Sequence, residues 1–476
     1  MTNLPPAFAS QEETPPQVLG EFKPVDDWQV HLNAIFYALR GGRIQDYYQT
    51  VASGDYRLAH ALAQEFYEAY RKHEALPETI LVHEWGCGNG NLAACFLSHL
   101  NKLDETLCRR TRYVLVDNDL DTLNSALAHP DLQPHRERIA HVQADAQDLN
   151  GVKDSSVHWI ICNELWNDLR TKVMLRKDGD LIEEQIRPNL SDEKSKEFAD
   201  WFAFVKDFQD KAVTKLKDHP SFLDEIIWEK DYLPIDWKRV PYRKTITDFM
   251  KPIDDLVIVP VNLGAFATIK EARRILTAGG RFTTFDAGTP DVETVAKPDK
   301  PCYGLYGGQY SFIVNFALCE SLARHLGATD VTIESQHEFV SRMLGHNLMT
   351  VVDLVSAHPS LNKLKPWERD KLILKTLRVL SAVYTSPYQR NFDYPVRPET
   401  PEPDREEILA LLASLPSTGV PDPIAYLTED EVLAVVTELV ALGYDRQAIQ
   451  NGLATSPTEG REIDYHRFSM GKEKNS

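Results

Sequence analysis

Short apolar runs alternate with helical patterns through much of the chain. The run 80–82 leads into a glycine-rich turn, and a helical pattern follows it. Further apolar runs at 113–116, 139–143 and 157–162 each end in polar residues, and the alternation resumes at 256–261. Strands that alternate with helices in this way are typical of a parallel, doubly wound α/β sheet, so the pattern predicts that fold class.

Two segments interrupt the alternation. Residues 175–250 are charged, aromatic and helical in pattern, and prolines crowd the stretch 393–405, which we interpret as a linker. The expected organisation is a disordered leader (1–24), a helical preface (25–75), a first half of the sheet domain (76–174), a helical insertion lobe (175–250), a second half (251–345), a helical extension (346–392), the linker (393–405) and a small helical C-terminal unit (406–476).

The turn after the first apolar run is the strongest local motif. It places Glu84 before three glycines at alternate positions, Gly86, Gly88 and Gly90. Glycine is needed where a backbone turns sharply and approaches a ligand without a Cβ in the way. A dinucleotide fingerprint would require a third glycine at Asn91, and no phosphate-binding G-x-x-x-x-G-K-[ST] loop is present. The turn therefore favours a ligand with adenosine and amino-acid groups, although such a cluster can also be only a strand-to-helix turn.

Acidic residues at the ends of the next two runs support a nucleoside site. Asp117 ends the second run, where a carboxylate can accept hydrogen bonds from both ribose hydroxyls. Asp145 and Ala146 follow the third run and are expected to flank the adenine. For Asp117 the alternative role is a helix N-cap, for which Asn118 and Asp119 would compete. Asp145 has the same alternative role as a capping residue.

Charge and composition exclude several classes of partner. The chain has 71 acidic and 52 basic residues, a formal net charge of −19, which argues against general binding to nucleic acid or to anionic membranes. No run approaches the roughly 18 to 20 apolar residues of a membrane span. The six cysteines form no C-x-x-C pair and the histidines are scattered, so we expect no metal site and a reducing, cytoplasmic location.

A late motif narrows the function. Residues 271–282 read E-A-R-R-I-L-T-A-G-G-R-F, a basic amphipathic helix, a glycine turn and a strand. Together with the glycine turn and the two acids, this segment resembles the class I S-adenosylmethionine-dependent methyltransferases, which have a Rossmann-like sheet. The resemblance implies S-adenosylmethionine as the cofactor, with Glu84 at its amino-acid end.

A narrower resemblance is carried by three segments: N-E-L-W-N-D-L at 163–169, Q-Y-S-F-I-V-N-F at 309–316 and S-Q-H-E-F-V at 335–340. They are similar to motifs of the MidA family of methyltransferases, which includes a mitochondrial arginine methyltransferase of complex I assembly. The resemblance covers about residues 25–345 and implies methyl transfer to a protein nitrogen. The chain departs from the family at Asn167 and Asn315, where the family usually has Asp, and at Arg170, where it has Pro.

Asn163 and Glu164 are the candidate catalytic residues, because they follow the fourth run at the edge where open α/β sheets bind ligands. A protonated arginine presents a planar fork of donors, and Glu164 could hold it; the alternative is that Glu164 caps a helix near Leu165. A small-molecule methyltransferase and a non-catalytic assembly protein are the other readings. The sequence leaves the oligomeric state open.

Overall fold

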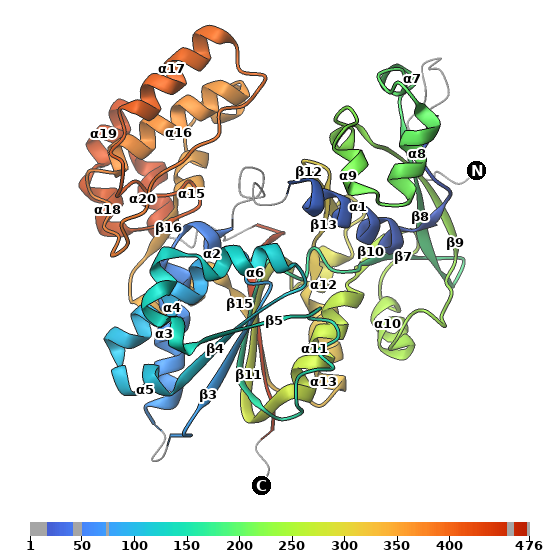
Figure 1. Ribbon diagram of the computed structural model, residues 1–476, viewed down its shortest axis with the longest axis horizontal. Coiled ribbons are helices and arrows are strands. Elements are labelled where there is room, and N and C mark those ends of the chain that lie inside the picture. Colours follow the sequence, from blue (N-terminus) through green and yellow to red (C-terminus); the bar gives the residue numbers. More distant parts are fainter. Residues whose placement is uncertain (1–16, 41–49, 73–75, 455–460, 474–476) are drawn as a thin grey trace.

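The computed structural model describes residues 17–40, 50–72, 76–454 and 461–473, so parts of the expected leader and preface lie outside the described residues. Within these ranges the central sheet has eight strands, seven of them in the order β5, β4, β3, β6, β11, β18, β15 (Figure 1). The strands are β3 (Ile80–Trp85), β4 (Thr111–Asp117), β5 (Ile139–Gln143), β6 (Val157–Asn163), β11 (Leu276–Thr289), β14 (Val314–Asn315), β15 (Thr329–Ser335) and β18 (Asp464–Gly471). The predicted α/β fold class is confirmed.

Side chains that alternate along each strand pack against two layers of helices. On β4, Tyr113 and Leu115 pack on one face of the sheet, and Val114 and Val116 pack on the other. The first face is covered by α2 (Val51–Gly54), α3 (Arg57–Tyr70), α4 (Asn91–Leu103), α5 (Glu105–Arg110), α6 (Leu120–Leu127) and α14 (Gln336–Leu344). The second is covered by α10 (Arg243–Met250), α11 (Leu263–Ile275), α12 (Val292–Val295) and α13 (Phe316–His325).

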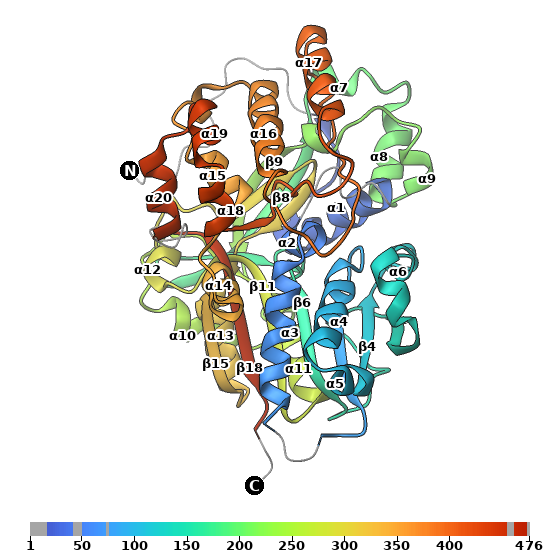
Figure 2. The same ribbon diagram turned by 90° about the vertical axis from the view of Figure 1, so that its left-hand side faces the viewer.

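The C-terminal strand β18 completes the central sheet. It pairs antiparallel with β11 on one side and with β15 on the other, as Figure 2 shows. Phe468 and Met470 enter the core, while Arg467 on the opposite face is buried between Glu65 and Glu334. The expectation of a wholly helical unit over 406–476 is therefore wrong, because a strand with alternating polar residues takes its stability from two distant neighbours.

The insertion lobe also contains a sheet. Six strands form it: β1 (Gln17–Val18), β2 (Lys23–Pro24), β7 (Lys172–Lys177), β8 (Asp180–Leu190), β9 (Ile227–Pro234) and β10 (Val259–Val261). Its helices are α7 (Asp192–Ser195), α8 (Trp201–Gln209) and α9 (Val213–Leu216). Three predictions are corrected. The insertion is not purely helical, and residues 17–24 of the expected disordered leader contain the short strands β1 and β2. The run at 256–261 supplies β10, which pairs with β7 outside the central sheet. Charged residues on β8 and β9 concealed the strands from a reading based on apolar runs.

A helical lobe lies between β15 and β18 in the chain. It comprises α15 (Val351–Ser356), α16 (Pro366–Leu380), α17 (Glu402–Ala413), α18 (Glu429–Ala434), α19 (Val436–Ala441) and α20 (Arg446–Ala454), with the pair β16 (Leu348–Thr350) and β17 (Tyr426–Thr428). The expected linker 393–405 already includes the first turn of α17. Because β18 returns to the sheet, the helical lobe is an insertion within the domain and not an extension beyond it.

Both lobes rise from the edge of the sheet at which the parallel strands end (Figure 1). The N-terminal helix α1 (Val25–Arg40) and the hairpin of β12 (Tyr303–Tyr306) and β13 (Gln309–Phe312) lie above the same edge. Helix α1 packs its apolar residues, among them Trp28, Ile35 and Phe36, into the core of the insertion lobe. In the part of the chain that the structure describes, no helix combines the length and apolarity needed to cross a membrane.

Candidate active site

The glycine turn joins β3 to α4 and continues the sheet by one hydrogen bond. The backbone N–H of Gly86 donates to the carbonyl oxygen of Val116 on β4 at 2.8 Å. All three glycines have positive φ, namely 71° at Gly86, 51° at Gly88 and 78° at Gly90. Residues with a Cβ rarely adopt this backbone conformation, so the turn needs glycine for its geometry alone.

The three glycines differ in what a side chain would meet. A Cβ at Gly90 would lie 2.8 Å from the carbonyl oxygen of Ala126, and one at Gly86 would lie 3.3 Å from Leu165. A Cβ at Gly88 would meet nothing within 4 Å. Gly86 and Gly90 are therefore also required by packing, whereas Gly88 faces open space. This space beside the turn fits the close approach of a cofactor.

Two carboxyl groups lie next to the turn. Glu84 is buried and accepts a hydrogen bond from the Tyr113 hydroxyl at 2.8 Å. Burial raises the pKa of Glu84 to about 8 and that of Asp117 to about 6. Helix α6 is capped by Asp119, so the N-cap alternative for Asp117 is wrong. The role of Asp117 as the ribose acceptor stays a prediction.

The structure places Asp145 and Ala146 in the turn after β5. Asp145 is exposed, and its carboxylate accepts hydrogen bonds from the backbone and side chain of Gln147, at 2.8 Å and 3.2 Å. Ala146 is buried in the core. The contact to Gln147 closes a turn, and no helix follows before β6, so the helix-cap alternative for Asp145 is wrong; its role beside an adenine stays a prediction.

We expect Asp117→Ala to weaken binding of S-adenosylhomocysteine by about 1.5–3 kcal/mol, because the variant loses hydrogen bonds to a charged acceptor. Calorimetry measures this loss. The matched control is Asp119→Ala, which removes the cap of α6 and should lower stability by about 1 kcal/mol while leaving the ribose acceptor in place. Equal affinities for Asp117→Ala and the wild type would remove Asp117 from the cofactor site.

Cofactor affinity should rise with pH between 5 and 7. Burial places the pKa of Asp117 near 6, and only the ionised carboxylate is a full acceptor for two hydroxyls. The carboxylate protonates as the pH falls through 6, so the affinity at pH 5 should be about tenfold lower than at pH 7. Calorimetric titration at several pH values checks this, and Asp117→Asn should abolish the dependence in this window. A wild-type affinity that is flat from pH 5 to 7 would contradict the role.

Asn163 and Glu164 stand at the end of β6, as predicted. Glu164 is 8% exposed and has φ of +48°, a strained conformation for a residue with a side chain. Its N–H donates to the carbonyl oxygen of Phe285 on β11 at 2.7 Å. No helix begins at Leu165, where the chain forms turns, so the helix-cap alternative is wrong. The strand end itself fixes the position of Glu164.

Two residues near Glu164, Asp286 and Tyr465, escaped the sequence analysis. Asp286 on β11 is fully buried and accepts hydrogen bonds from the N–H groups of Trp166 and Asn167 at 2.8 Å and 3.2 Å. Burial first, and then the charge of Glu164, raise the pKa of Asp286 well above its usual value. The hydroxyl of Tyr465 on β18 lies 3.3 Å from a carboxylate oxygen of Glu164. The C-terminal strand thus reaches the candidate site.

A third acid, Asp168, lies in the turn after β6 and was not among the expected site residues. Its carboxylate accepts hydrogen bonds from the Tyr37 hydroxyl on α1 and from the Gln309 amide on β13. The signal that could have revealed Tyr37 is a polar stripe on α1, in which Gln29, Asn33 and Tyr37 are spaced four residues apart.

Two of the three departures from the MidA motifs, Asn315 and Arg170, have structural explanations. Asn315 caps α13 by accepting a hydrogen bond from Leu318 at 3.1 Å and donates to the carbonyl oxygen of Pro260 at 3.2 Å, a pair of roles that an aspartate could not fill. Arg170 forms ion pairs with Asp26 and Asp27 at the start of α1, at 2.9 Å and 2.6 Å. These contacts explain why Asn315 and Arg170 stand at these positions.

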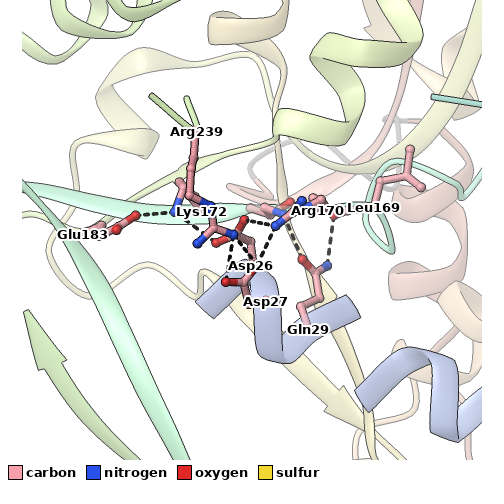
Figure 3. A network of polar contacts seen from close by, with 9 residues as sticks. Asp26, Asp27, Gln29, Leu169, Arg170, Lys172, Glu183 and Arg239 are labelled. Atoms are coloured by element: carbon pink, nitrogen blue, oxygen red, sulfur yellow. Dashed lines mark hydrogen bonds and ion pairs between the residues drawn. The ribbon is translucent and has the colours of Figure 1, made fainter. Parts of the chain in front are cut away.

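The acidic start of α1 is held by further cations (Figure 3). Buried Lys172 on β7 pairs with Asp26 at 3.1 Å and also with Glu183 on β8, while Arg239 pairs with Asp27 at 2.7 Å. Gln29 donates to the carbonyl oxygen of Leu169 at 3.0 Å. This network fixes α1 against the turn after β6, so that Tyr37 further along the helix can reach Asp168.

Among the described residues, neither a hollow elsewhere on the protein nor a metal-binding cluster offers a better candidate for the active site than the carboxyl edge of the central sheet. A hollow of about 700 Å³ lies between α14 and the start of α18, lined by residues that include Glu338 and Asp430, and no candidate residue lines it. No group of three or more His, Cys, Asp or Glu side chains in the described ranges could hold a metal ion.

Comparison with known proteins identifies the family. Residues 61–353, more than half of the chain, match the family described as "Putative S-adenosyl-L-methionine-dependent methyltransferase". Comparison with curated proteins gives no match.

Several solved structures resemble the chain. A COG1565 superfamily protein from Burkholderia thailandensis bound to S-adenosyl-homocysteine has 13% identity and a TM-score of 0.47, with 96% of this chain and 89% of that chain covered. A native structure of a protein of that superfamily, from the same organism, has 13% identity and a TM-score of 0.45, with 96% and 88% covered. Phosphoethanolamine N-methyltransferase 2 of Haemonchus contortus has 9% identity and a TM-score of 0.31, with 92% and 56% covered. By its family match over residues 61–353, the chain belongs to the MidA-like family of S-adenosylmethionine-dependent methyltransferases.

Proposed function

We propose that this methyltransferase transfers a methyl group to a nitrogen of a protein side chain, and that the acceptor is arginine. The observation that carries the proposal is an excess of hydrogen-bond acceptors at the carboxyl edge of the sheet. Glu164 directly follows β6, and the Oδ1 atom of Asn163, the last residue of that strand, is buried without a hydrogen-bond partner among the described residues. A buried acceptor without a donor is costly, so a ligand that brings donors is favoured there.

The charges at this edge of the sheet also favour arginine as the residue that receives the methyl group. Burial raises the pKa values of Asp117, Asp168 and Asp286, and in the described part of the chain no lysine or arginine is among the strongest influences on these three acids. A positive ligand would stabilise the ionised form of these acids. A guanidinium carries a permanent positive charge, five N–H donors and no acceptor, and it therefore complements both features.

The proposed roles follow from position. The space beside Gly88 would admit the cofactor, Asp117 would hold its ribose, and Glu84 would orient its amino-acid end. The bound cofactor supplies an activated methyl group, so the chain's main contribution is to align an acceptor nitrogen with it. Asn163 and Glu164 would accept hydrogen bonds from the N–H groups of the arginine that receives the methyl group.

The test offers methyl-labelled S-adenosylmethionine to a library of arginine-containing peptides and, in parallel, to a panel of small amines. We expect label in the peptides, and mass spectrometry should place the methyl group on the guanidinium. A methyl group found only on a small metabolite would show that the protein is a small-molecule methyltransferase, and the arginine proposal would be wrong.

We also propose a reducing compartment such as the cytoplasm, because all six cysteines are buried and form no disulfide. Cell fractionation checks this: recovery in an oxidising compartment would contradict it.

A further inference from the structure

A second polar cluster, formed by Tyr37, Asp168 and Gln309, lies at the same edge of the sheet as Glu164. Its members come from α1, from the turn after β6 and from β13. The Nε2 atom of Gln309 donates to Asp168 at 2.5 Å and lies 3.0 Å from the Tyr37 hydroxyl, which itself donates to the other carboxylate oxygen of Asp168. Three segments far apart in sequence therefore converge on one carboxylate.

The cluster reaches the protein surface through one member, Tyr37, while Gln309 is fully buried. Tyr37 remains 40% exposed, although burial and the charge of Asp168 raise its pKa well above the usual value. The charge of Asp117, the candidate ribose acid, contributes to the raised pKa of Tyr37. The charge of Asp168 likewise contributes to the raised pKa of Asp286. The cluster thus interacts electrostatically both with the candidate ribose acid on β4 and with the acid beside Glu164 on β11.

One atom of the cluster lacks a partner. Gln309 is fully buried, its Nε2 is used by Asp168 and Tyr37, and its Oε1 has no hydrogen-bond partner in the part of the chain that is described. The cluster therefore offers a ligand two kinds of acceptor, the carboxylate of Asp168 and the amide oxygen of Gln309. Its donors, the Tyr37 hydroxyl and the Gln309 amide nitrogen, are already used within the cluster. A ligand that fits must bring N–H donors and positive charge.

We infer that Asp168 and Gln309, positioned by Tyr37, form a second binding site for the guanidinium of the acceptor arginine, in addition to Asn163 and Glu164. This inference rests on the proposed function. A planar guanidinium has donors on more than one edge, so two acceptor pairs can hold it in one orientation, whereas one carboxylate leaves it free to rotate. The rigid anchoring of α1 by Asp26 and Asp27 serves this geometry, because it fixes Tyr37 above Asp168.

The probe for the test is N-acetyl-arginine amide, and calorimetry measures its binding to protein saturated with S-adenosylhomocysteine. N-acetyl-citrulline amide, which is neutral and nearly isosteric, is the ligand control. We expect the wild type to bind the arginine probe and not the citrulline probe. Asp168→Asn should weaken binding of the arginine probe at least tenfold and leave the affinity for S-adenosylhomocysteine within twofold. Asp248→Asn, which removes an exposed charge on α10, should change neither.

Tyr37→Phe separates a positioning role of Tyr37 from a purely structural one, because only a positioning role predicts a shift in the pH dependence of probe binding. The hydroxyl of Tyr37 lowers the pKa of Asp168, which burial raises to about 6. Loss of that hydrogen bond raises the pKa further, so the pH at which probe binding is half lost should increase, while affinity at pH 8 stays within threefold. The groups that bear on Asp168 are Tyr37 on α1, Gln309 on β13 and Asp286 on β11.

The outcomes separate the two proposals. If Glu164→Gln loses the arginine probe while Asp168→Asn binds it like the wild type, or if Tyr37→Phe leaves the pH midpoint unchanged, the second site is wrong and the proposed function stands. If the wild type fails to bind the arginine probe, or binds the citrulline probe equally well, both proposals are overturned.

Discussion

Glu164→Gln is expected to lower turnover on the true substrate at least about a hundredfold, equivalent to about 2.7 kcal/mol. The affinity for S-adenosylhomocysteine should stay within about threefold, because Glu164 follows β6 and not the glycine turn. The substitution keeps the shape of the side chain and removes the charge that would hold a guanidinium. Radiolabel transfer and calorimetry on the same purified variant measure the two quantities.

The structure supplies a stability control for this variant. The charge of Glu164 contributes to the raised pKa of buried Asp286, so the two carboxylates repel each other. Removing that charge relieves the repulsion, and the melting temperature at pH 8 should not fall. Lost activity without lost stability is the pattern expected of a site strained for function. Unchanged turnover would return Glu164 to a structural role, and a parallel loss of cofactor affinity would make it a cofactor ligand.

Gly88→Val should weaken binding of S-adenosylhomocysteine at least about a hundredfold, equivalent to about 2.7 kcal/mol. A Cβ at Gly88 would meet no protein atom within 4 Å, so the valine would extend into the space proposed for the cofactor. Its branched side chain also resists the left-handed backbone of the turn. Calorimetry on folded protein measures the loss.

Two further glycine variants isolate the cause of that loss. Gly179 lies in the turn between β7 and β8 with φ of +87° and has open space around it, so Gly179→Val should have a similar backbone cost and no effect on cofactor binding. Gly90→Ala should instead lower stability, because its Cβ would lie 2.8 Å from the carbonyl oxygen of Ala126. Full affinity in a folded Gly88→Val protein would mean that the turn is purely structural.

The helical lobe and the insertion lobe share the edge of the sheet that carries these residues. Buried Arg57 on α3 pairs with Glu431 on α18 at 2.8 Å and donates to the carbonyl oxygen of Tyr426, which ties the helical lobe to the sheet domain. Asn91, the first residue of α4, donates to the carbonyl oxygens of Ala52 and Asp55 at 2.6 Å and 2.7 Å. The segment beside the glycine turn is thus held by elements that also contact the helical lobe.

The sequence by itself determined the strand-turn-helix around Gly86 to Gly90, the acids that end the strands, and the family and cofactor. These features are local: each strand, its turn and its polar end lie within a few residues, and apolar runs and glycine spacing report such structure directly. The strands at 80–82, 113–116, 139–143 and 157–162 are confirmed for this reason.

Only the tertiary structure decided which distant side chains meet at the site. Tyr37 and Asp168 are 131 residues apart, Gln309 and Asp168 are 141 apart, and Tyr465 and Glu164 are 301 apart. Such pairs leave no periodic signal, because each polar residue looks solvent-exposed until its partner is known. The strand β18 was missed for the same reason: its polar residues are satisfied by neighbours on β11, β15 and α3, and a chain that ends in a polar segment gives no local indication that the sheet needs it.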